Sequence, residues 1–214
     1  MNAVIRTQKV NKTSRGVRIL QDIDLELEKG KIYGFVGPNG SGKSMLFKAL
    51  TGLTKVDSGT IEVLGEVLGK NVDFPSHTRA LIEHPGFLPG LSGFKNLKWL
   101  ASIQNLIGDA EIREAIRLVG LDPQDRRPVK KYSLGMKQRL GIAQALMERP
   151  QILILDEPMN GLDTQGVKDI RNILLGLKEQ GVTILLSSHI REDIDVLCDE
   201  VFRMDRGVLR PESA

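Results

Sequence analysis

The sequence predicts an α/β fold, in which helices flank a parallel β-sheet and an all-helical segment is inserted into the chain. Three observations support this prediction. Strand and helix patterns alternate at both ends of the 214-residue chain, which is typical of a parallel sheet. A glycine-rich turn at residues 37–42 joins a strand pattern to a helix pattern. Residues 76–148, between the two ends, show almost no strand pattern.

The N-terminal part begins with short apolar runs that are typical of strands. These runs are VIRTQKV, the alternating ILQDIDLELE, and KIYGFVG directly before the glycine-rich turn. The segment KSMLFKALTGL follows with helical spacing and ends at Gly52, because glycine favours a helix C-terminus. TIEVLG, residues 60–65, predicts a further strand.

The middle segment has helix signals alone. Ser92, Asp109 and Ser133 are good N-caps for three helices, and Gly120 is placed to end the second one. We therefore expect one domain over residues 1–214. Residues 1–75 and 149–214 would form its core, and residues 76–148 a helical insertion.

The C-terminal part returns to alternation of strand and helix. QILILD at 151–156 is fully apolar up to its last residue and predicts a strand buried on both faces. A helix from Asp163 to Gly181, the buried strand VTILLSS and the short helix IREDIDVLC follow. A terminal hairpin is predicted around Arg206 and Gly207.

Composition excludes several classes of protein. Apolar residues make up 41% and charged residues 27%, which excludes a wholly disordered chain. The net charge of +3 is too small to argue for binding to nucleic acid or membranes. Cys198 is the one cysteine, so an internal disulfide is excluded, and its apolar surroundings predict a buried, inert thiol. The longest aliphatic runs are far shorter than the ~20 residues that cross a bilayer, so we expect another chain to provide any membrane attachment.

The turn GPNGSGKS fits the phosphate-binding pattern G-x-x-x-x-G-K-[ST] between a strand and a helix. Its glycines let the backbone turn N–H groups toward an anion, and the helix N-terminus behind them adds further donors. Lys43 can reach the β- and γ-phosphates, and Ser44 can bind Mg²⁺. The pattern predicts a nucleoside triphosphate site formed by Gly37, Pro38, Asn39, Gly40, Ser41, Gly42, Lys43 and Ser44.

Two acidic residues follow the second buried strand. Asp156 ends this strand and Glu157 comes next, at the sheet edge where ligands sit in open α/β folds. We interpret Asp156 as a ligand of Mg²⁺ and Glu157 as the group that orients or deprotonates the attacking water. A solvated acidic turn is the alternative, which the phosphate-binding pattern disfavours. No guanine-selective NKxD follows the turn, which favours ATP over GTP.

With these motifs in place, the chain resembles the ATP-binding cassette (ABC) ATPases. YSLGMKQRLGIAQAL, residues 132–146, is similar to the signature segment of that family, whose common form is LSGGQ. GPNGSGKS, YSLGMKQ, ILILDEP, NGLD at 160–163 and SSH at 187–189 follow in the family's order, over nearly the whole chain. The resemblance implies a P-loop NTPase parallel sheet core with an N-terminal antiparallel β subdomain and an inserted all-helical subdomain.

The resemblance also implies further site residues. Ser133 and Gly135 would contact the γ-phosphate of ATP held by a second protomer, and Asp163 would connect the two sites across that interface. His189 would bind the γ-phosphate and fix the water near Glu157. A plain helix cap is the alternative for Ser133, and a hydrogen-bonded histidine at a strand end is the alternative for His189.

The chain departs from the family pattern at three places. Ser14, beside Arg15, stands where the family has an aromatic residue stacked on adenine, so we expect weaker recognition of the base. Glu83 stands at the family's γ-phosphate-sensing Gln, where it could approach Mg²⁺ or be a surface acid displaced from the site. Leu134 and Met136 replace a Gly and a Gln of the signature.

The function implied by the resemblance is ATP hydrolysis that powers a membrane transporter. ATP and Mg²⁺ would be the cofactors, and ATP would drive two cassettes together. The YSLGM variant and residues 80–97 look most like bacterial single-cassette exporters of the bacitracin and bacteriocin self-protection type. Export of an antimicrobial peptide, a drug or a lipid-like compound is therefore expected.

The expected partners are separate transmembrane subunits and a second cassette, identical or closely related, at the cytoplasmic face of the membrane. No nucleic-acid partner is expected. A soluble ABC ATPase acting on nucleic acid or the ribosome is the alternative function, but such proteins typically have a long coiled-coil insertion or two fused cassettes. A P-loop kinase would have no role for the signature helix or His189.

Several residues near the insertion have weaker expectations. A helix of the membrane subunit would dock on four apolar residues, with core packing as the alternative: Phe87, Leu88, Leu91 and Phe94. Trp99 is expected in the core, and His77 and His84 on the surface. A basic group is interpreted as a solvated loop, with lipid headgroup contact as the alternative: Arg126, Arg127, Lys130 and Lys131.

Overall fold

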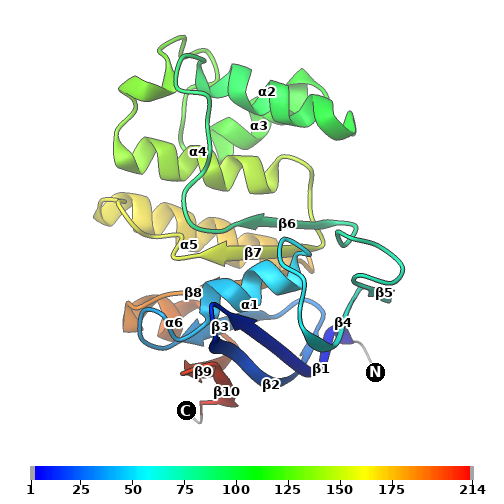
Figure 1. Cartoon of the computed structure of the whole chain (residues 1–214). Coiled ribbons are helices and arrows are strands. Elements are labelled where there is room, and N and C mark those ends of the chain that lie inside the picture. Colours follow the sequence, from blue (N-terminus) through cyan, green and yellow to red (C-terminus); the bar gives the residue numbers. More distant parts are fainter. Residues whose placement is uncertain (1–2, 213–214) are drawn as a thin grey trace.

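The computed structural model describes residues 3–212, in which a six-stranded sheet, a four-stranded sheet and six α-helices are present (Figure 1). The ends of the expected domain, 1–2 and 213–214, lie outside the described residues. In chain order the elements are β1 (Ala3–Ser14), β2 (Val17–Glu28), β3 (Ile32–Val36), α1 (Lys43–Leu50), β4 (Ser58–Val63), β5 (Glu66–Val67), β6 (Thr78–Leu81), α2 (Gly93–Gln104), α3 (Asp109–Leu118), the 3₁₀ helix η1 (Val129–Lys131), α4 (Leu134–Leu146), β7 (Ile152–Asp156), α5 (Thr164–Glu179), β8 (Thr183–Ser187), α6 (Arg191–Leu197), β9 (Glu200–Asp205) and β10 (Val208–Pro211).

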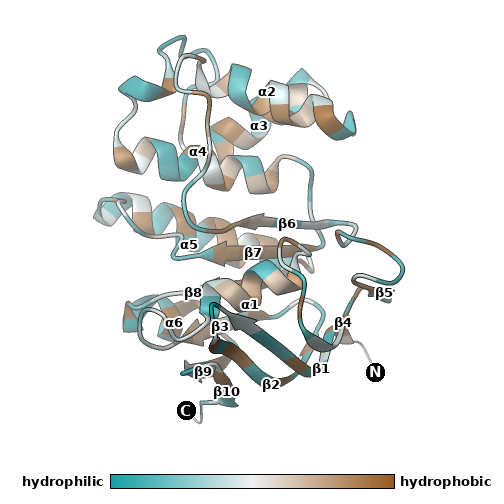
Figure 2. Cartoon of the chain, in the orientation of Figure 1, coloured by the Kyte–Doolittle hydropathy of each residue, from teal (hydrophilic) through white to brown (hydrophobic). Residues whose placement is uncertain are grey.

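The six-stranded sheet has the order β10-β9-β3-β8-β7-β6. Strands β9, β3, β8, β7 and β6 run parallel, and β10 pairs antiparallel with β9 at one edge. Every residue of β7 and β8 is buried, as expected for strands covered on both faces. Figure 2 shows the hydrophobic residues of β7 and of α1. The parallel α/β sheet that the sequence predicts is confirmed.

The strand register brings three segments of the chain to one edge of this sheet. Phe35 of β3 lies opposite Ser187 of β8, and Asp156 of β7 lies opposite the same Ser187. The loop after β3 and the ends of β7 and β8 therefore meet at the carboxyl edge. In open α/β sheets this edge is the place where ligands bind.

The four-stranded sheet is antiparallel and has the order β2-β1-β4-β5. β1 and β2 form a hairpin whose tip residues, Arg15 and Gly16, have positive φ angles of 49° and 80°, as a two-residue hairpin turn requires. The inward side chains of this sheet, such as Leu20 and Leu27, share one buried cluster with α1 and β3. The antiparallel N-terminal β subdomain is thus confirmed.

Helices α2, α3 and α4 form the layer at the top of Figure 1. Ser92 and Ser133 cap α2 and α4 as predicted, because each Oγ accepts a hydrogen bond from the backbone N–H three residues later. α3 begins at Asp109 and has Gly108 as its N-cap, one residue before the expected cap. Gly120, with φ 76°, follows the end of α3 as predicted.

Two expectations for this part of the chain were wrong. Residues 78–81 form β6 in the main sheet, although helices alone were expected over 76–148. Four residues with two polar side chains are too short to show strand periodicity. Trp99 is 55% exposed, although it was expected in the core. Leu97 and Ala101, two residues to either side, take the inward positions of α2, so Trp99 points outward.

The apolar residues expected to receive a partner helix are divided between core and surface. Phe87 and Phe94 are half-buried and pack against the core of the helical layer. Leu91 is half-buried, and Leu88 is 44% exposed. Core packing thus accounts for both phenylalanines, and Leu88 stays on the surface. Over residues 3–212, every helix is too short or too polar to cross a bilayer.

Cys198 follows α6 and lies against Gly34 of β3. A Cβ built on Gly34 would lie 2.8 Å from the Cys198 Sγ atom, which shows how closely α6 packs on this strand. Burial raises the pKa of Cys198 to about 12. Since the thiolate is the reactive form, the thiol is inert at neutral pH.

A buried ion pair joins α5 to α6. The Arg171 guanidinium donates to Asp193 Oδ1 at 2.9 and 2.6 Å, and the Asp193 side chain is fully buried. The Ser188 Oγ donates to the other Asp193 oxygen at 3.0 Å and accepts from the N–H of Ile190 at 3.0 Å. This network fixes the loop that follows β8.

Replacing Arg171 with leucine should destabilise the fold, because Asp193 would be left as a buried charge without its cation. Breaking a buried pair in this way costs about 3 kcal/mol or more, which lowers the melting temperature by roughly 6–12 °C in a domain of this size. Thermal unfolding by circular dichroism measures the shift.

The matched control is Arg191→Leu. The Arg191 side chain is 92% exposed and its guanidinium pairs with Asp195 at 3.6 Å, so its loss should shift the melting temperature by less than about 2 °C. Equal shifts in the two variants would show that the buried pair adds nothing to stability.

Candidate functional site

The glycine-rich turn between β3 and α1 is closely packed against two other segments. Gly37 has φ 146°, and a Cβ at this position would lie 2.1 Å from the carbonyl oxygen of Met204 in β9. Gly42 has φ 116°, and its Cβ would lie 2.7 Å from the Ile19 carbonyl oxygen in β2. Glycine is therefore required at both positions, by conformation and by space. The N–H of Gly207 also donates to the Ser41 carbonyl at 2.8 Å.

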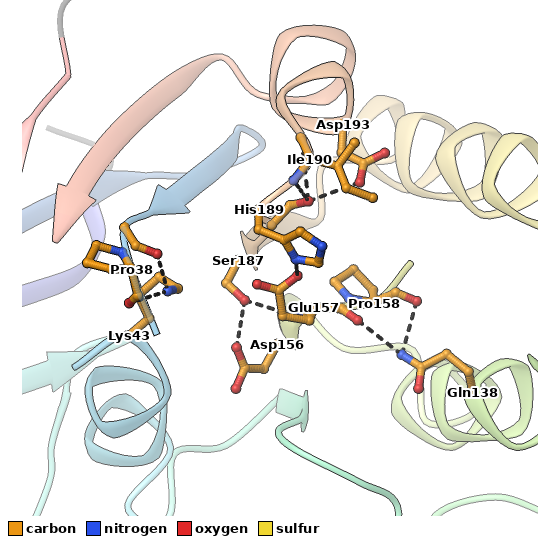
Figure 3. A network of polar contacts seen from close by, with 12 residues as sticks. Pro38, Lys43, Gln138, Asp156, Glu157, Pro158, Ser187, His189, Ile190 and Asp193 are labelled. Carbon is orange, nitrogen blue, oxygen red and sulfur yellow. Dashed lines mark hydrogen bonds and ion pairs between the residues drawn. The ribbon is translucent and has the colours of Figure 1, made fainter. Parts of the chain in front are cut away.

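Lys43 lies across the inside of this turn, as Figure 3 shows. Its Nζ donates to the carbonyl oxygens of Gly37 at 2.7 Å and Pro38 at 3.2 Å. The Ser41 Oγ is buried in the same turn, and no hydrogen-bond partner for it is present among the described residues. A buried hydroxyl without a partner, next to a lysine and a helix N-terminus, fits a phosphate group.

Asp156 joins the turn to the neighbouring strand. The Ser44 Oγ donates to Asp156 Oδ2 at 2.6 Å, and the Ser187 Oγ donates to Asp156 Oδ1 at 2.6 Å. Asp156 is 8% exposed. A hydroxyl and a carboxylate in direct contact at the sheet edge are a suitable set of oxygen ligands for Mg²⁺. The structure thus brings the predicted residues Ser44 and Asp156 together.

Glu157 and His189 face each other at the end of this edge (Figure 3). The His189 Nδ1 lies 2.8 Å from Glu157 Oε2, and the imidazole is 63% exposed. The backbone N–H of Glu157 donates to the Ser187 Oγ at 2.9 Å. Glu157 also has a positive φ of 51°, which is uncommon for a residue with a side chain. The predicted pair of an acid and a histidine is therefore assembled by the fold.

Gln138 of α4 belongs to the same network, and sequence reasoning missed it. The Nε2 donates to the carbonyl oxygens of Pro158 at 3.0 Å and Glu157 at 3.4 Å, as Figure 3 shows. The side chain is buried. The available signal was its position, because Gln138 lies one helical turn before the buried Ile142 on the apolar face of α4.

Glu83 contacts Lys48 of α1, one helical turn after Ser44. Its Oε1 accepts a hydrogen bond from the Lys48 Nζ at 2.5 Å, and its side chain is 61% exposed. Its φ of 60° marks a sharp turn after β6. Among the described residues, Lys48 is therefore the partner of the Glu83 carboxylate.

Ser133, Gly135 and Asp163 lie beside each other, outside the Asp156 network. A Cβ on Gly135 would lie 2.9 Å from the carbonyl oxygen of Gly161, so the start of α4 touches the NGLD loop. Asp163 caps α5 by accepting from the N–H of Gly166 at 2.9 Å. Ser133 and Asp163 are exposed, and a second molecule can therefore reach them.

The other residues singled out from the sequence are on the surface. Arg15 is exposed at the tip of the β1–β2 hairpin, and Ser14 beside it is half-buried. His77 and His84 are exposed, as expected. The basic group is exposed throughout, as a solvated loop would be: Arg126, Arg127, Lys130 and Lys131.

Comparisons with known proteins agree on one family. A family model described as "ABC transporter" matches residues 20–160. The uncharacterized ABC transporter ATP-binding protein YybJ of Bacillus subtilis (strain 168) is 45% identical over 203 residues, 95% of this chain and 91% of that protein. The bacitracin transport ATP-binding protein BcrA of Enterococcus faecalis is 39% identical over 214 residues, 99% of this chain and 70% of that protein.

A solved structure supports the fold. The ATP-binding cassette MJ0796, in a dimeric post-hydrolysis state bound to ADP and Pi, matches with a TM-score of 0.88 over 98% of both chains, at 21% identity. The family match and the close relatives together identify the activity class, and the chain belongs to the ABC transporter family as one of its ATP-hydrolysing cassettes.

Proposed function

We propose that this chain is the energy-supplying cassette of a bacterial exporter, and that it works by ATP-driven pairing with a second cassette. The observation behind the proposal is the continuous polar network at the sheet edge, which runs from Ser44 through Asp156 and Ser187 to Glu157 and His189. This network supports the proposal because it would bring a phosphate-binding turn, a metal-binding pair and a general base together, as hydrolysis of a terminal phosphate needs.

The phosphate-binding turn would hold the nucleotide. Lys43 would exchange its two backbone carbonyls for the β- and γ-phosphates, and the Ser41 hydroxyl would gain a partner. Ser44 and Asp156 would hold Mg²⁺, which neutralises phosphate charge when it is bound. Glu157 would accept the proton of the attacking water, and His189 would orient that water and the γ-phosphate.

The exposed Ser133 and Asp163, together with the half-buried Gly135, would meet the nucleotide and the edge of a second cassette. The N-terminus of α4 presents backbone donors and the positive end of a helix dipole, which suits a γ-phosphate. Leu134 is 63% exposed beside these residues, and burial of its side chain would add to the pairing. ATP bound between two molecules would thus hold them together.

A transmembrane subunit would dock beside the segment between β6 and α2, and the cassette would lie at the cytoplasmic face of the membrane through this partner. Leu88 is the exposed apolar residue of that segment. A peptide antibiotic or another amphipathic compound is the proposed cargo, because the Enterococcus faecalis relative is named for bacitracin transport. No role for nucleic acid is proposed.

Leu88→Asp should weaken attachment to the membrane subunit, because a charge would replace the exposed leucine. An affinity-tagged chain expressed in its own cells is expected to co-isolate with a polypeptide that has several membrane spans, and the variant should lose most of it. Val196→Asp is the control, since Val196 is 48% exposed on α6. Hydrolysis stimulated by nucleic acid, without a membrane partner, would favour a soluble ATPase instead.

Glu157→Gln should abolish hydrolysis and leave ATP binding intact, because an amide cannot accept the proton. The loss should be at least ~100-fold in kcat. With ATP and Mg²⁺ the variant should elute as a pair on size-exclusion chromatography, and as a single molecule without ATP. Adding Ser133→Phe should keep it single in both conditions. A Glu157→Gln variant that hydrolyses ATP at the normal rate would remove Glu157 from the role of base.

Glu83→Gln should leave ATPase activity equal or higher at low Mg²⁺. The change removes a negative charge near the phosphates and supplies a group that can both donate and accept. Loss of the exposed Lys48 pair should cost at most about 1 kcal/mol of stability. Rates are compared over a Mg²⁺ titration, with Glu26→Gln as the control, since Glu26 pairs with Arg6 in the small sheet. A hundredfold loss of activity contradicts the expectation.

A further inference from the structure

We propose that Gln138 is a positioning residue for hydrolysis. Its side-chain amide holds the backbone turn that aims the Glu157 carboxylate, and it makes the position of that carboxylate depend on helix α4. The inference rests on the proposed role of Glu157 as the base. It adds a residue of the signature helix that acts inside one cassette, on the same molecule's own catalytic edge.

The geometry of the contact is specific. Gln138 approaches the turn after β7 from α4, and its Nε2 donates to two successive carbonyl oxygens, those of Glu157 and Pro158. The Glu157 carbonyl also accepts from the N–H of Asn160 at 3.2 Å. Among the described residues, the Gln138 amide is the hydrogen-bond donor to the Pro158 carbonyl. Pro158 is buried, so losing this donor would leave a buried carbonyl unpaired, which is costly.

The turn needs external support because Glu157 is strained. Its φ of 51° lies in the left-handed region, where a residue with a side chain is disfavoured by about 1–2 kcal/mol. Glu157 is held on its N-terminal side by the Ser187 hydroxyl and on its C-terminal side by the Gln138 amide. If the second support is removed, the backbone is free to relax, and the carboxylate would then turn away from His189.

Helix α4 links this support to the surface that faces a second cassette. Ser133 caps the helix, and Gln138 follows within the next two turns. Because a helix moves as a rigid unit over this short length, a displacement at Ser133 reaches Gln138. Arg139 fixes the same helix to α5, since its guanidinium donates to Asp169 at 3.0 Å. Correct docking of Ser133 would thus favour the geometry in which Glu157 is aimed.

Two isosteric substitutions test the inference. Gln138→Met keeps the volume and removes the donor, and Gln138→Glu places an acceptor against two carbonyl oxygens. Both should lower kcat by about 10- to 100-fold, the size of effect expected from small misplacement of a catalytic group. The KM for ATP and the affinity for a fluorescent ATP analogue should change little, since the phosphate-binding turn is untouched. The melting temperature should fall by roughly 2–12 °C, because one buried carbonyl loses its donor.

The pH profile separates positioning from simple packing. In Gln138→Glu a protonated carboxyl regains a donor, so its kcat relative to wild type should rise as pH falls from 8 to 6, because burial raises the pKa of such a carboxyl. Gln138→Met should show no such recovery. Gln104→Met is the matched control, because Gln104 accepts from Arg79 at the exposed end of α2, and it should behave as wild type.

The outcomes distinguish this inference from the function that it extends. If Gln138→Met retains a kcat within twofold of wild type while Glu157→Gln is inactive, Gln138 has no positioning role, and the proposed role of Glu157 as the base is still supported. If Glu157→Gln hydrolyses ATP normally, the base assignment itself falls. A loss of kcat in Gln138→Glu that does not depend on pH, with an equal loss of nucleotide affinity, would show a packing defect and overturn the proposal.

Discussion

The Asp156 carboxylate, held between two serine hydroxyls, is the contact on which the whole site depends. Ser44 comes from the start of α1 and Ser187 from the end of β8, and each donates to one oxygen of Asp156 at 2.6 Å. These contacts are possible because β3, β8 and β7 are parallel neighbours whose carboxyl ends lie level. The parallel sheet thus aligns three distant parts of the chain: the glycine-rich turn, the Asp156 carboxylate and the end of β8.

Spacing along the chain located residues whose role is local, and the strand-end position or the family resemblance located Asp156, Glu157 and His189. The glycines of the turn and the caps Ser92 and Ser133 act on their immediate neighbours, so their spacing alone indicates their place. Gln138, Trp99 and β6 were missed because each depends on packing between distant elements. Nothing near Gln138 in the chain reveals that the Pro158 carbonyl lies opposite its amide. Glu83 was located by its sequence position, but its partner Lys48 follows from the three-dimensional structure.

Strain and support occur together at the catalytic edge. The Glu157 backbone is left-handed, and hydrogen bonds from two different elements hold it there. The loop with His189 is likewise held from outside, through Ser188, Asp193 and Arg171. Backbone strain of this kind persists only where its surroundings enforce it. The reactive side chains are therefore placed by residues that do not themselves touch the substrate.

The β9–β10 hairpin packs against the glycine-rich turn. The Met204 carbonyl fills the space beside Gly37, and the N–H of Gly207 binds the Ser41 carbonyl. The cradle is thus shaped by residues synthesised more than 160 positions after it. Because a chain is synthesised from its N-terminus, a nascent chain that already contains the turn would still lack the β9–β10 hairpin. The ability to hold nucleotide would therefore arise late in synthesis, once the hairpin has packed against the turn.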